Sequence, residues 1–573
     1  MANSWRPSVA RAWLAMKVGL AATSSLSVAA TSSPNAAATL PVNGTAPLPA
    51  NIVVDAAARR HPISPLIYGL NYATADTLRA LRVPIDRSGG NSASTYNWRL
   101  DAHNTGVDWF FESLPVDPKA VYQYNDRFVS SARDGHATPM LTIPMIGRVA
   151  KLDKDGKPLA SFSVAKYGKQ QGADPSGWPD AGNGIALDGT PIKNDPDDAS
   201  VPDDPQSQQA RIKRLVQTFG NANAGGVRYY LMDNEPSLWH VGHRDVHPVG
   251  AHASEIASRV VTYARAVKAV DPGARVVAPE EWGWNGYRYS GFDQQYLAAG
   301  HGGPETAPDK LGETHGMDYV PWLLTQWKQA GHPVDVVSLH FYPQGGEFKE
   351  TQGANPAVAD APAIELLRNR STRDLWDPTY QDPTWIHSVI ALIPLMRQWV
   401  DTYYDAGTPI AITEYSWGGD TTMNGATAQA DVLGIFGREG LDIAARWGTL
   451  TPDMPVYKAF ALYRNYDGQG SGFGTTSVAA TGMQTDPDQV SSFAALRDHD
   501  SVLTIVVINK QRDRPADATI AVEHFAAQGK AETWQLADNA LARVLDADLA
   551  GGQLRATLPP KSVTLFVLRG VAR

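Results

Sequence analysis

Between residues 66 and 447, short apolar runs alternate with longer segments in which apolar residues recur at helical spacing. Short apolar runs bounded by turn residues are typical of buried strands, and strands that alternate with helices are typical of a parallel α/β fold. Eight such runs predict a (β/α)8 barrel of the TIM type. The predicted barrel strands are 66–71, 83–87, 140–144, 228–233, 275–279, 334–341, 410–413 and 441–447.

The intervening segments and the C-terminal part complete the predicted α/β organisation. Apolar residues at helical spacing predict helices at 207–220, 253–270, 319–330, 386–404 and 426–436. After about residue 475 the pattern changes to β-rich segments, which predict a C-terminal β-sandwich with strands at 476–483, 491–497, 502–509, 518–524, 531–536 and 562–568. We therefore expect a barrel at 61–472, a sandwich at 473–573, and a strand within 49–60 that joins the sandwich.

The N-terminal segment has the composition of an export signal. Residues 1–30 contain Arg6, Arg11 and Lys17 but no acidic residue, and a mildly apolar run ends in small residues near 28–30. We interpret 1–30 as a signal peptide and 31–48 as a flexible lead-in, which predicts a secreted or periplasmic protein. The alternative interpretation is a disordered N-terminal tail.

Composition excludes several classes of function. The net charge is −9, which argues against nucleic acid as a partner because phosphate binding depends on Lys and Arg. The chain contains no cysteine, so disulfides, thiolate metal sites and cysteine nucleophiles are excluded. Outside the N-terminal segment no apolar run has the length of a membrane span. We expect the protein to be a monomer.

Two predicted strands end in a glutamate. The run 228–233 stops at Asn234-Glu235-Pro236, where the proline prevents the strand from continuing, and the run 410–413 stops at Glu414. In a TIM-type barrel both glutamates would lie at the C-terminal rim, where such barrels have their active sites. A carboxylic acid and a carboxylate at one rim are what glycosidic bond cleavage requires. Either glutamate alone is also compatible with a simple polar strand exit.

Other residues at predicted strand ends are candidates for the same site. Arg87 can hold Glu414 ionised. His340, on the strand 334–341, and Tyr342, just beyond it, face the same side because side chains alternate along a strand. Tyr342 can donate to Glu414, and His340 can orient either glutamate. Trp417 and Trp447 follow the seventh and eighth strands and are candidate sugar platforms. The structural alternatives are an arginine that stabilises a strand end, a buried histidine with its hydrogen bonds made, and core tryptophans.

Metal sites receive weaker support from the sequence. His243 and His247 have the spacing of a zinc pair but lack the adjacent glutamate, and Pro248 follows directly. The acidic segment from Asp195 to Asp204 offers hard oxygen ligands for a structural calcium ion, although a solvated acidic loop has the same composition. No cofactor is expected for the chemistry.

Several motifs resemble one known family. The segment 233–248 (DNEPSLWHVGHRDVHP) is similar to the acid/base segment of glycoside hydrolase family 44, and 413–419 (TEYSWGG) is similar to its nucleophile segment. Further similar motifs are RSGGN at 87–91, YNW at 96–98, TIPM at 142–145, FSVAKYG at 162–168, GIFGREG at 434–440 and LYRNYD at 462–467. The resemblance extends over about residues 50–573, with a departure at Ser237, where the family pattern would have an acidic residue.

The resemblance implies a retaining, endo-acting β-1,4-glucanase that acts on cellulosic glucans including xyloglucan. By the same resemblance Glu235 is the general acid/base and Glu414 the nucleophile. Physical chemistry agrees with these roles: an apolar pocket beside Glu235, lined by Trp239, would favour its protonated form, and Asn234 is placed to bind the sugar 2-hydroxyl. Two alternatives stay open, a noncatalytic polysaccharide-binding barrel and an exo-acting β-glycosidase whose groove is closed by one of the long segments 145–205 or 343–385.

Overall fold

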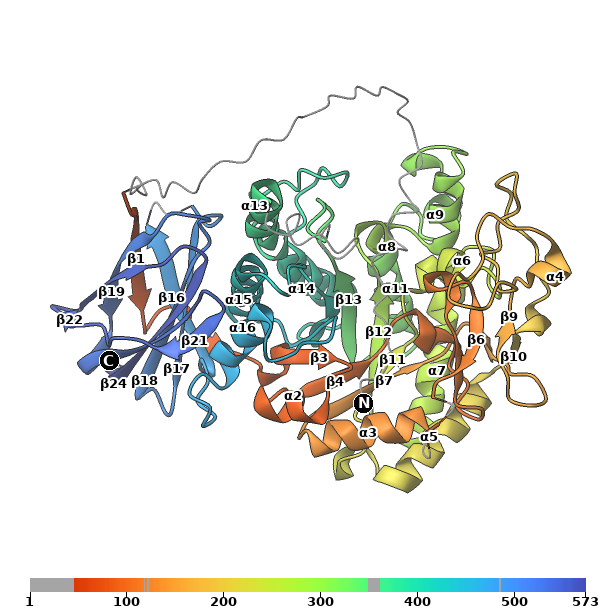
Figure 1. Cartoon of the computed structure of the whole chain (residues 1–573), viewed down its shortest axis with the longest axis horizontal. Coiled ribbons are helices and arrows are strands. Elements are labelled where there is room, and N and C mark those ends of the chain that lie inside the picture. Colours follow the sequence, from red (N-terminus) through yellow and green to blue (C-terminus); the bar gives the residue numbers. More distant parts are fainter. Residues whose placement is uncertain (1–45, 118, 121–122, 349–360, 484–485, 573) are drawn as a thin grey trace, which may run out of the picture.

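The chain folds into a barrel and a sandwich that lie side by side (Figure 1). The structure is a computed structural model that describes residues 46–117, 119–120, 123–348, 361–483 and 486–572. The predicted signal peptide at 1–30 and nearly all of the predicted lead-in lie outside the described residues. Within the described ranges, no helix combines the length and apolarity that crossing a bilayer requires.

Eight parallel strands close the barrel in the order β11, β12, β13, β14, β15, β3, β4 and β7. Each predicted run overlaps one of these strands, so the predicted fold class is confirmed. The first run was placed too early, because Pro65–Tyr68 form a 3-10 helix whose N-terminus is capped by Ser64. The barrel strands are β3 (Gly69–Asn71), β4 (Ile85–Ser88), β7 (Thr138–Ile143), β11 (Tyr229–Met232), β12 (Arg275–Glu281), β13 (Val336–Phe341), β14 (Ile410–Tyr415) and β15 (Ile443–Arg446).

Alternate residues of each strand point to opposite sides of the barrel wall. In β11, Tyr229 and Leu231 belong to the cluster that fills the barrel interior, whereas Tyr230 and Met232 belong to the larger core beneath the helices. All four residues are buried, as expected for a parallel strand covered on both faces. This is why the strands appear in the sequence as continuous apolar runs.

The five predicted helices are present, namely α5 (Pro205–Phe219), α7 (Ala253–Val270), α11 (Tyr319–Gln329), α14 (Leu392–Tyr403) and α15 (Met423–Arg438). The helix predicted at 386–404 begins later, because Ala391 has a left-handed backbone conformation that a helix does not admit. Within the described residues, the other α-helices are α2 (Ala75–Ala80), α3 (Tyr124–Asp134), α4 (Val164–Tyr167), α6 (Trp239–Gly242), α8 (Trp284–Arg288), α9 (Gly291–Ala298), α10 (Pro308–Gly312), α13 (Pro362–Ser371) and α16 (Pro455–Arg464).

The long segments around β7 form a small annex on the side of the barrel away from the sandwich (Figure 1). One small sheet consists of β5 (Ala102–Asn104), β6 (Glu112–Pro115) and β9 (Leu159–Ala160), and β8 (Arg148–Ala150) pairs with β10 (Ser200–Pro202). Residues 145–205 are therefore folded against the barrel and its neighbouring loops.

The sandwich consists of two sheets that share β16 (Thr476–Met483). The first half of β16 pairs with β17 and its second half pairs with β1 (Leu48–Asp55), which also pairs in parallel with β19. β2 (His61–Pro62) pairs with β16, so the chain leaves the sandwich only after Pro62. The other strands are β17 (Val490–Arg497), β18 (Val502–Asn509), β19 (Ala516–Glu523), β20 (Phe525–Ala537), β21 (Ala540–Arg543), β22 (Leu549–Ala550), β23 (Gln553–Leu558) and β24 (Ser562–Ala572).

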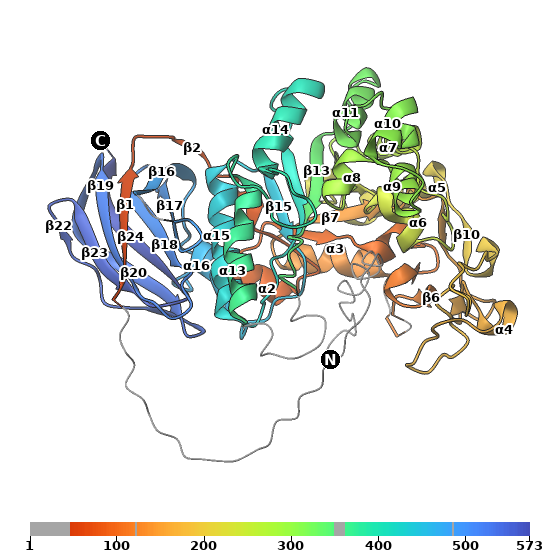
Figure 2. The same cartoon turned by 90° about the horizontal axis from the view of Figure 1, so that it is seen from above.

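Helix α15 connects the two domains and lies between the barrel and the sandwich, as the view from above shows (Figure 2). Residues 424–437 of this helix are all buried. Gly434 lies so close to the ring of Phe493 in β17 that a Cβ atom there would overlap it. The helix therefore packs on the barrel with one side and on strands of the sandwich with the other.

Candidate active site

Glu235 follows β11 at the C-terminal rim of the barrel, where a sharp turn fixes it. Asp233 and Glu235 both have positive φ angles, of 69° and 46°. The carboxylate of Asp233 accepts hydrogen bonds from the backbone N–H groups of Met145, Ile146 and Asn234, which holds the turn against the end of β7. Pro236 then begins a 3-10 helix, so the strand ends here.

Glu414 lies near the end of β14 and is held on both carboxylate oxygens. Arg87 in β4 donates to Oε2 at 2.9 Å, and Tyr342 donates from its hydroxyl to Oε1 at 2.8 Å. The register with β13 and with β15 shifts beside this residue, and such irregularities re-aim side chains at barrel rims. Both contacts that the sequence analysis expected for Glu414 are present.

The two glutamates approach each other closely. One oxygen of Glu235, one ring nitrogen of His340 and one oxygen of Glu414 all lie within 4.8 Å of one another. His340 Nδ1 is 3.0 Å from Glu235 Oε1 and 3.8 Å from Glu414 Oε2. The arrangement places a largely buried acid beside a carboxylate that is held by an arginine.

The surroundings give the two carboxyl groups different properties. Burial raises the pKa of Glu235, while the hydrogen bond and charge of His340 oppose that rise. Burial lowers the pKa of Arg87, but the carboxylates of Glu280 and Glu414 beside it raise that pKa by more, so the guanidinium stays charged. Burial and the neighbouring Glu414 raise the pKa of Tyr342 well above its usual value, which keeps the phenol a hydrogen-bond donor.

Asn234 is oriented by its neighbours on the barrel rim. Its side-chain oxygen accepts from Gly90 N at 3.0 Å and from Arg87 at 3.3 Å, and its amide nitrogen lies 3.5 Å from Asn91 Oδ1. The amide oxygen is thus occupied and the amide group is fixed beside Glu235. The predicted contact between Asn234 and a sugar hydroxyl stays a prediction.

The three candidate tryptophans have different positions. Trp447 is half-buried, stands edge-to-face with Tyr72 and lies against Gly90, so it is close to Asn234. Trp417 is only 1% exposed and donates its indole N–H to Ser371, and its expected role as a sugar platform is wrong because its rings are enclosed. Trp239 is fully buried, and its expected place in the wall of an apolar pocket beside Glu235 stays a prediction.

Sequence reasoning missed three acidic residues at the site. Glu280 and Glu281 end β12, and both are fully buried. Glu281 accepts from the backbone N–H and the hydroxyl of Ser237, and burial raises its pKa to about 8. Burial raises the pKa of Asp108 to about 7, and the negative charges of Glu235 and Glu414 add to the rise. The signal that the sequence offered was the pair of adjacent glutamates directly after a predicted barrel strand.

Most of the candidate metal ligands of the sequence have other partners in the structure. In the acidic segment Asp197 pairs with Arg148, Asp198 pairs with Lys166 at 2.5 Å, and Asp204 caps α5. These carboxylates have protein partners, and a structural calcium ion in this segment stays a prediction. His243 is buried, and burial lowers its pKa to about 4, whereas His247 bonds to Glu255 at 3.1 Å.

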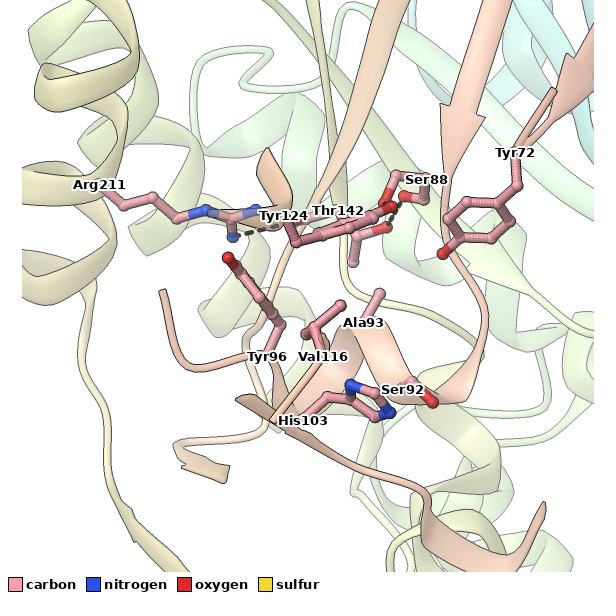
Figure 3. A pocket seen from close by; sticks show the side chains of 10 residues that line it. All are labelled: Tyr72, Ser88, Ser92, Ala93, Tyr96, His103, Val116, Tyr124, Thr142 and Arg211. Carbon is pink, nitrogen blue, oxygen red and sulfur yellow. Dashed lines mark hydrogen bonds between the residues drawn. The ribbon is translucent and has the colours of Figure 1, made fainter. Parts of the chain in front are cut away.

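A small cavity lies at the rim between β3, β4 and the annex (Figure 3). Tyr124 and Ser88 are hydrogen-bonded at 2.7 Å on one side of it, and Arg211 donates to the carbonyl of Thr142 at 3.0 Å on the other. Its volume of about 20 Å³ is enough for a water molecule but not for a sugar. This cavity is therefore not the substrate groove.

A (β/α)8 barrel with two closely spaced glutamates at its C-terminal rim is typical of glycoside hydrolases. Residues 102–345 match the model of glycoside hydrolase family 44. The chain belongs to glycoside hydrolase family 44.

Three similar proteins illustrate this membership. The solved structure of CelM2, a bifunctional glucanase-xylanase from a metagenome library, is 49% identical, covers 91% of this chain and 99% of its own, and has a TM-score of 0.87. A Paenibacillus polymyxa xyloglucanase of the same family, solved with xyloglucan, is 29% identical, covers 91% and 99% of the two chains, and has a TM-score of 0.72. Endoglucanase A of Paenibacillus lautus is 29% identical over 90% of this chain and 72% of its own length.

Proposed function

We propose that this glycoside hydrolase is an endo-acting enzyme that cleaves β-1,4-glucan chains with retention of the anomeric configuration. The observation that carries the proposal is the approach of a Glu235 oxygen to within 4.8 Å of a Glu414 oxygen. Retaining glycosidases have carboxyl groups about 5–5.5 Å apart, whereas inverting enzymes need roughly 6.5–9.5 Å to admit a water molecule. The spacing supports double displacement.

The first step forms a covalent bond between Glu414 and the sugar. One Glu414 oxygen attacks the anomeric carbon, the bond from that carbon to the leaving oxygen breaks, and Glu235 gives its proton to the leaving oxygen. Burial of Glu235 raises its pKa and so favours the protonated form that this step needs. Arg87 and Tyr342 orient Glu414 through their hydrogen bonds to its two oxygens.

The second step releases the sugar. Glu235, now ionised, takes a proton from water, the water oxygen attacks the anomeric carbon, and the ester bond to Glu414 breaks. Glu235 thereby regains the proton that it lost. In both steps we expect the amide of Asn234 to bind the 2-hydroxyl and Trp447 to support the sugar at the cleavage point.

The similar proteins support the choice of substrate. Their names state endoglucanase, xyloglucanase and glucanase-xylanase activities. Cellulose-type glucans and xyloglucan are therefore the first substrates to test. Xylan is a second candidate, because the glucanase-xylanase is 49% identical to this chain.

Two measurements test the proposal. Reducing-end release and product sizes on carboxymethylcellulose, xyloglucan, xylan and mannan distinguish random internal cleavage from the stepwise release of an exo-acting enzyme. Activity on none of these chains, together with binding to one of them, would instead support a noncatalytic polysaccharide-binding barrel. Proton NMR of the first-formed product then decides the stereochemistry, since retention requires an initial β-anomer.

Export and oligomeric state are further parts of the proposal. The composition of residues 1–30 supports cleavage of a signal peptide and a secreted or periplasmic location. N-terminal sequencing of protein recovered outside the cytoplasm would find the new N-terminus near residue 30 if this is correct. Light scattering of the purified protein tests the expected monomer.

A further inference from the structure

A third carboxylate lies beneath the two catalytic candidates. Glu280 at the end of β12 is fully buried and accepts hydrogen bonds from Arg87 at 2.9 Å on Oε2 and from the hydroxyl of Thr413 at 2.9 Å on Oε1. Its Oε2 is also 3.2 Å from His340 Nε2. The other ring nitrogen of His340 faces Glu235 at 3.0 Å. The imidazole therefore connects Glu280 to the proposed acid/base.

Counting donors shows which form of His340 fits this arrangement. The NH1 group of Arg87 has two hydrogens, and Asn71 and Glu414 accept them. The NH2 group also has two, but three acceptors surround it: Glu280 at 2.9 Å, His340 Nε2 at 3.1 Å and Asn234 at 3.3 Å.

A neutral imidazole has one N–H and leaves a conflict in either tautomer. If Nδ1 carries the hydrogen, the Nε2 lone pair faces the Glu280 carboxylate; if Nε2 carries it, the Nδ1 lone pair faces Glu235 once that group is ionised in the glycosyl-enzyme. An imidazolium removes this conflict. Its Nε2–H donates to Glu280, its Nδ1–H donates to Glu235, and the two NH2 hydrogens of Arg87 then serve Glu280 and Asn234.

The charge of the buried cluster gives the same answer. Before reaction Arg87 and an imidazolium carry two positive charges, Glu280 and Glu414 carry two negative charges, and Glu235 is protonated. In the glycosyl-enzyme the charge of Glu414 is lost in the ester while Glu235 becomes ionised, so the sum is again zero. A neutral His340 would leave one uncompensated negative charge in both states, which is unfavourable in a buried site.

The other titratable groups around the ring add no positive charge, so none of them favours a neutral imidazole. Burial raises the pKa of Glu281 to about 8, and the hydroxyl of Tyr287 donates to the backbone carbonyl of His340. Tyr342 remains a neutral phenol, and Asp108 has a pKa raised to about 7. Burial lowers the pKa of His340, but Glu414, Glu235 and Glu280 outweigh this and raise it to about 9.

We propose that Glu280 is a positioning residue that keeps His340 protonated, with its Nδ1–H on Glu235, through both steps of the reaction. This inference rests on the retaining mechanism proposed above. The proton on His340 is not transferred to the substrate. Its role is to stabilise ionised Glu235 after the first step, when that carboxylate must act as the base, and to hold the carboxyl group in place before it.

The direct test is the protonation state of His340 in the unmodified enzyme. Histidine-selective ¹⁵N labelling at pH 7.5, with the signal of His340 assigned by its loss in His340→Asn, should show both ring nitrogens protonated. A neutral ring at this pH overturns the proposal, whatever the variants do.

The functional test is Glu280→Gln, which removes the charge and keeps the shape. Without Glu280 we expect His340 to lose its proton and Glu235 to become harder to ionise. With a substrate that has a good aryl leaving group, the second step limits kcat. The acidic limb of the kcat profile should then move to higher pH by about one unit or more, which equals about a tenfold loss of rate at a fixed acidic pH. The basic limb of kcat/KM should move in the same direction. Reduced rates with both limbs unmoved would mean a merely structural role and would sink the idea.

Three further variants complete the design. Glu280→Asp keeps the charge and should return the limbs close to their original pH. His340→Asn should reproduce the shift, with no additional shift in the Glu280→Gln/His340→Asn double variant, because both changes act through one group. Glu365→Gln, at a buried carboxylate in α13 outside the site, should leave the limbs in place. If the unmodified enzyme retains configuration but these shifts fail, only this inference falls, whereas inversion or inactivity would remove the proposed function itself.

Discussion

Two buried clusters of charged residues in this molecule have opposite compositions. At the boundary between barrel and sandwich, Lys510 pairs with Asp431 of α15 at 2.6 Å, and both side chains are almost fully buried. The hydroxyls of Thr372 and Ser491 also donate to Asp431. One positive charge meets one negative charge, and the surrounding polar groups complete their hydrogen bonds.

The cluster at the barrel rim is arranged differently. Glu235, Glu280 and Glu414 share Arg87 and His340, and Glu281 lies behind them with a raised pKa. Three carboxyl groups around two cations can be neutral only when one of the three holds a proton. The Lys510–Asp431 pair joins two domains, whereas the rim cluster, with one more carboxyl group than cations, holds a proton that it can donate. The difference predicts that substitutions in the first cluster affect stability and those in the second affect chemistry.

The largest expected effect follows from Glu414→Ala. Removing the nucleophile should lower kcat by about 10⁴-fold or more, since groups that form covalent intermediates have no substitute in the active site. Azide should restore part of the activity with aryl substrates and yield an α-glycosyl azide, because it enters from the side that Glu414 occupied. The thermal midpoint of unfolding should not fall, because the rim has three carboxyl groups for two cations and two of them remain. Inactivity with a clearly lowered midpoint would show that the rim cluster stabilises the fold as well.

Glu235→Gln should give a smaller loss that depends on the leaving group. General acid catalysis contributes about 10²–10⁴-fold, so substrates with poor leaving groups should lose most of that factor in kcat/KM, while those with good leaving groups lose little at the first step. A series of aryl glycosides with different leaving-group pKa values measures this dependence. An equal loss across the series would contradict the assignment of Glu235 as the acid.

Lys510→Met tests the Lys510–Asp431 pair. Breaking a buried ion pair leaves Asp431 uncompensated and should lower the free energy of unfolding by about 3–5 kcal/mol. The double variant Lys510→Met/Asp431→Leu should recover much of the loss, because neither charge is then left alone. Denaturant unfolding measures both values, and kcat at a temperature where the variants are folded should stay unchanged. A large fall in kcat of the folded variants would break the division between the two clusters.

The comparison of sequence and structure shows which parts of this division could be predicted. Most of the barrel strands were recognisable because they are apolar, and Glu235 and Glu414 stood out because each lies at the end of such a run. The contacts of Arg87 and Tyr342 with Glu414 followed from their places at strand ends. The roles of these residues in catalysis stay predictions.

Other features depend on packing that one sequence does not display. Trp417 and Trp447 both follow a barrel strand, yet one packs on Phe341 and Tyr415 in the core and the other stands half-buried against Tyr72. Glu280 reads as an ordinary polar strand end, and only the closed barrel places it beneath His340. The partner of Lys510 could not be inferred either, since Asp431 lies in a different domain.

The smallest expected effect concerns Glu281, which belongs to the rim but holds its proton at neutral pH. Its pKa rises from 4.5 to about 8 on burial, so between these values the folded protein binds a proton that the unfolded chain releases. Stability should therefore fall as the pH rises through this window, by at most about 1.4 kcal/mol per pH unit from this group. Glu281→Gln should remove that part of the slope, because the amide keeps the shape but has no proton to release. Denaturant unfolding of both proteins at pH 5, 6, 7 and 8 measures the difference. Parallel curves would mean that Glu281 is ionised in the folded protein, and the charge count at the rim would then include a fourth carboxylate.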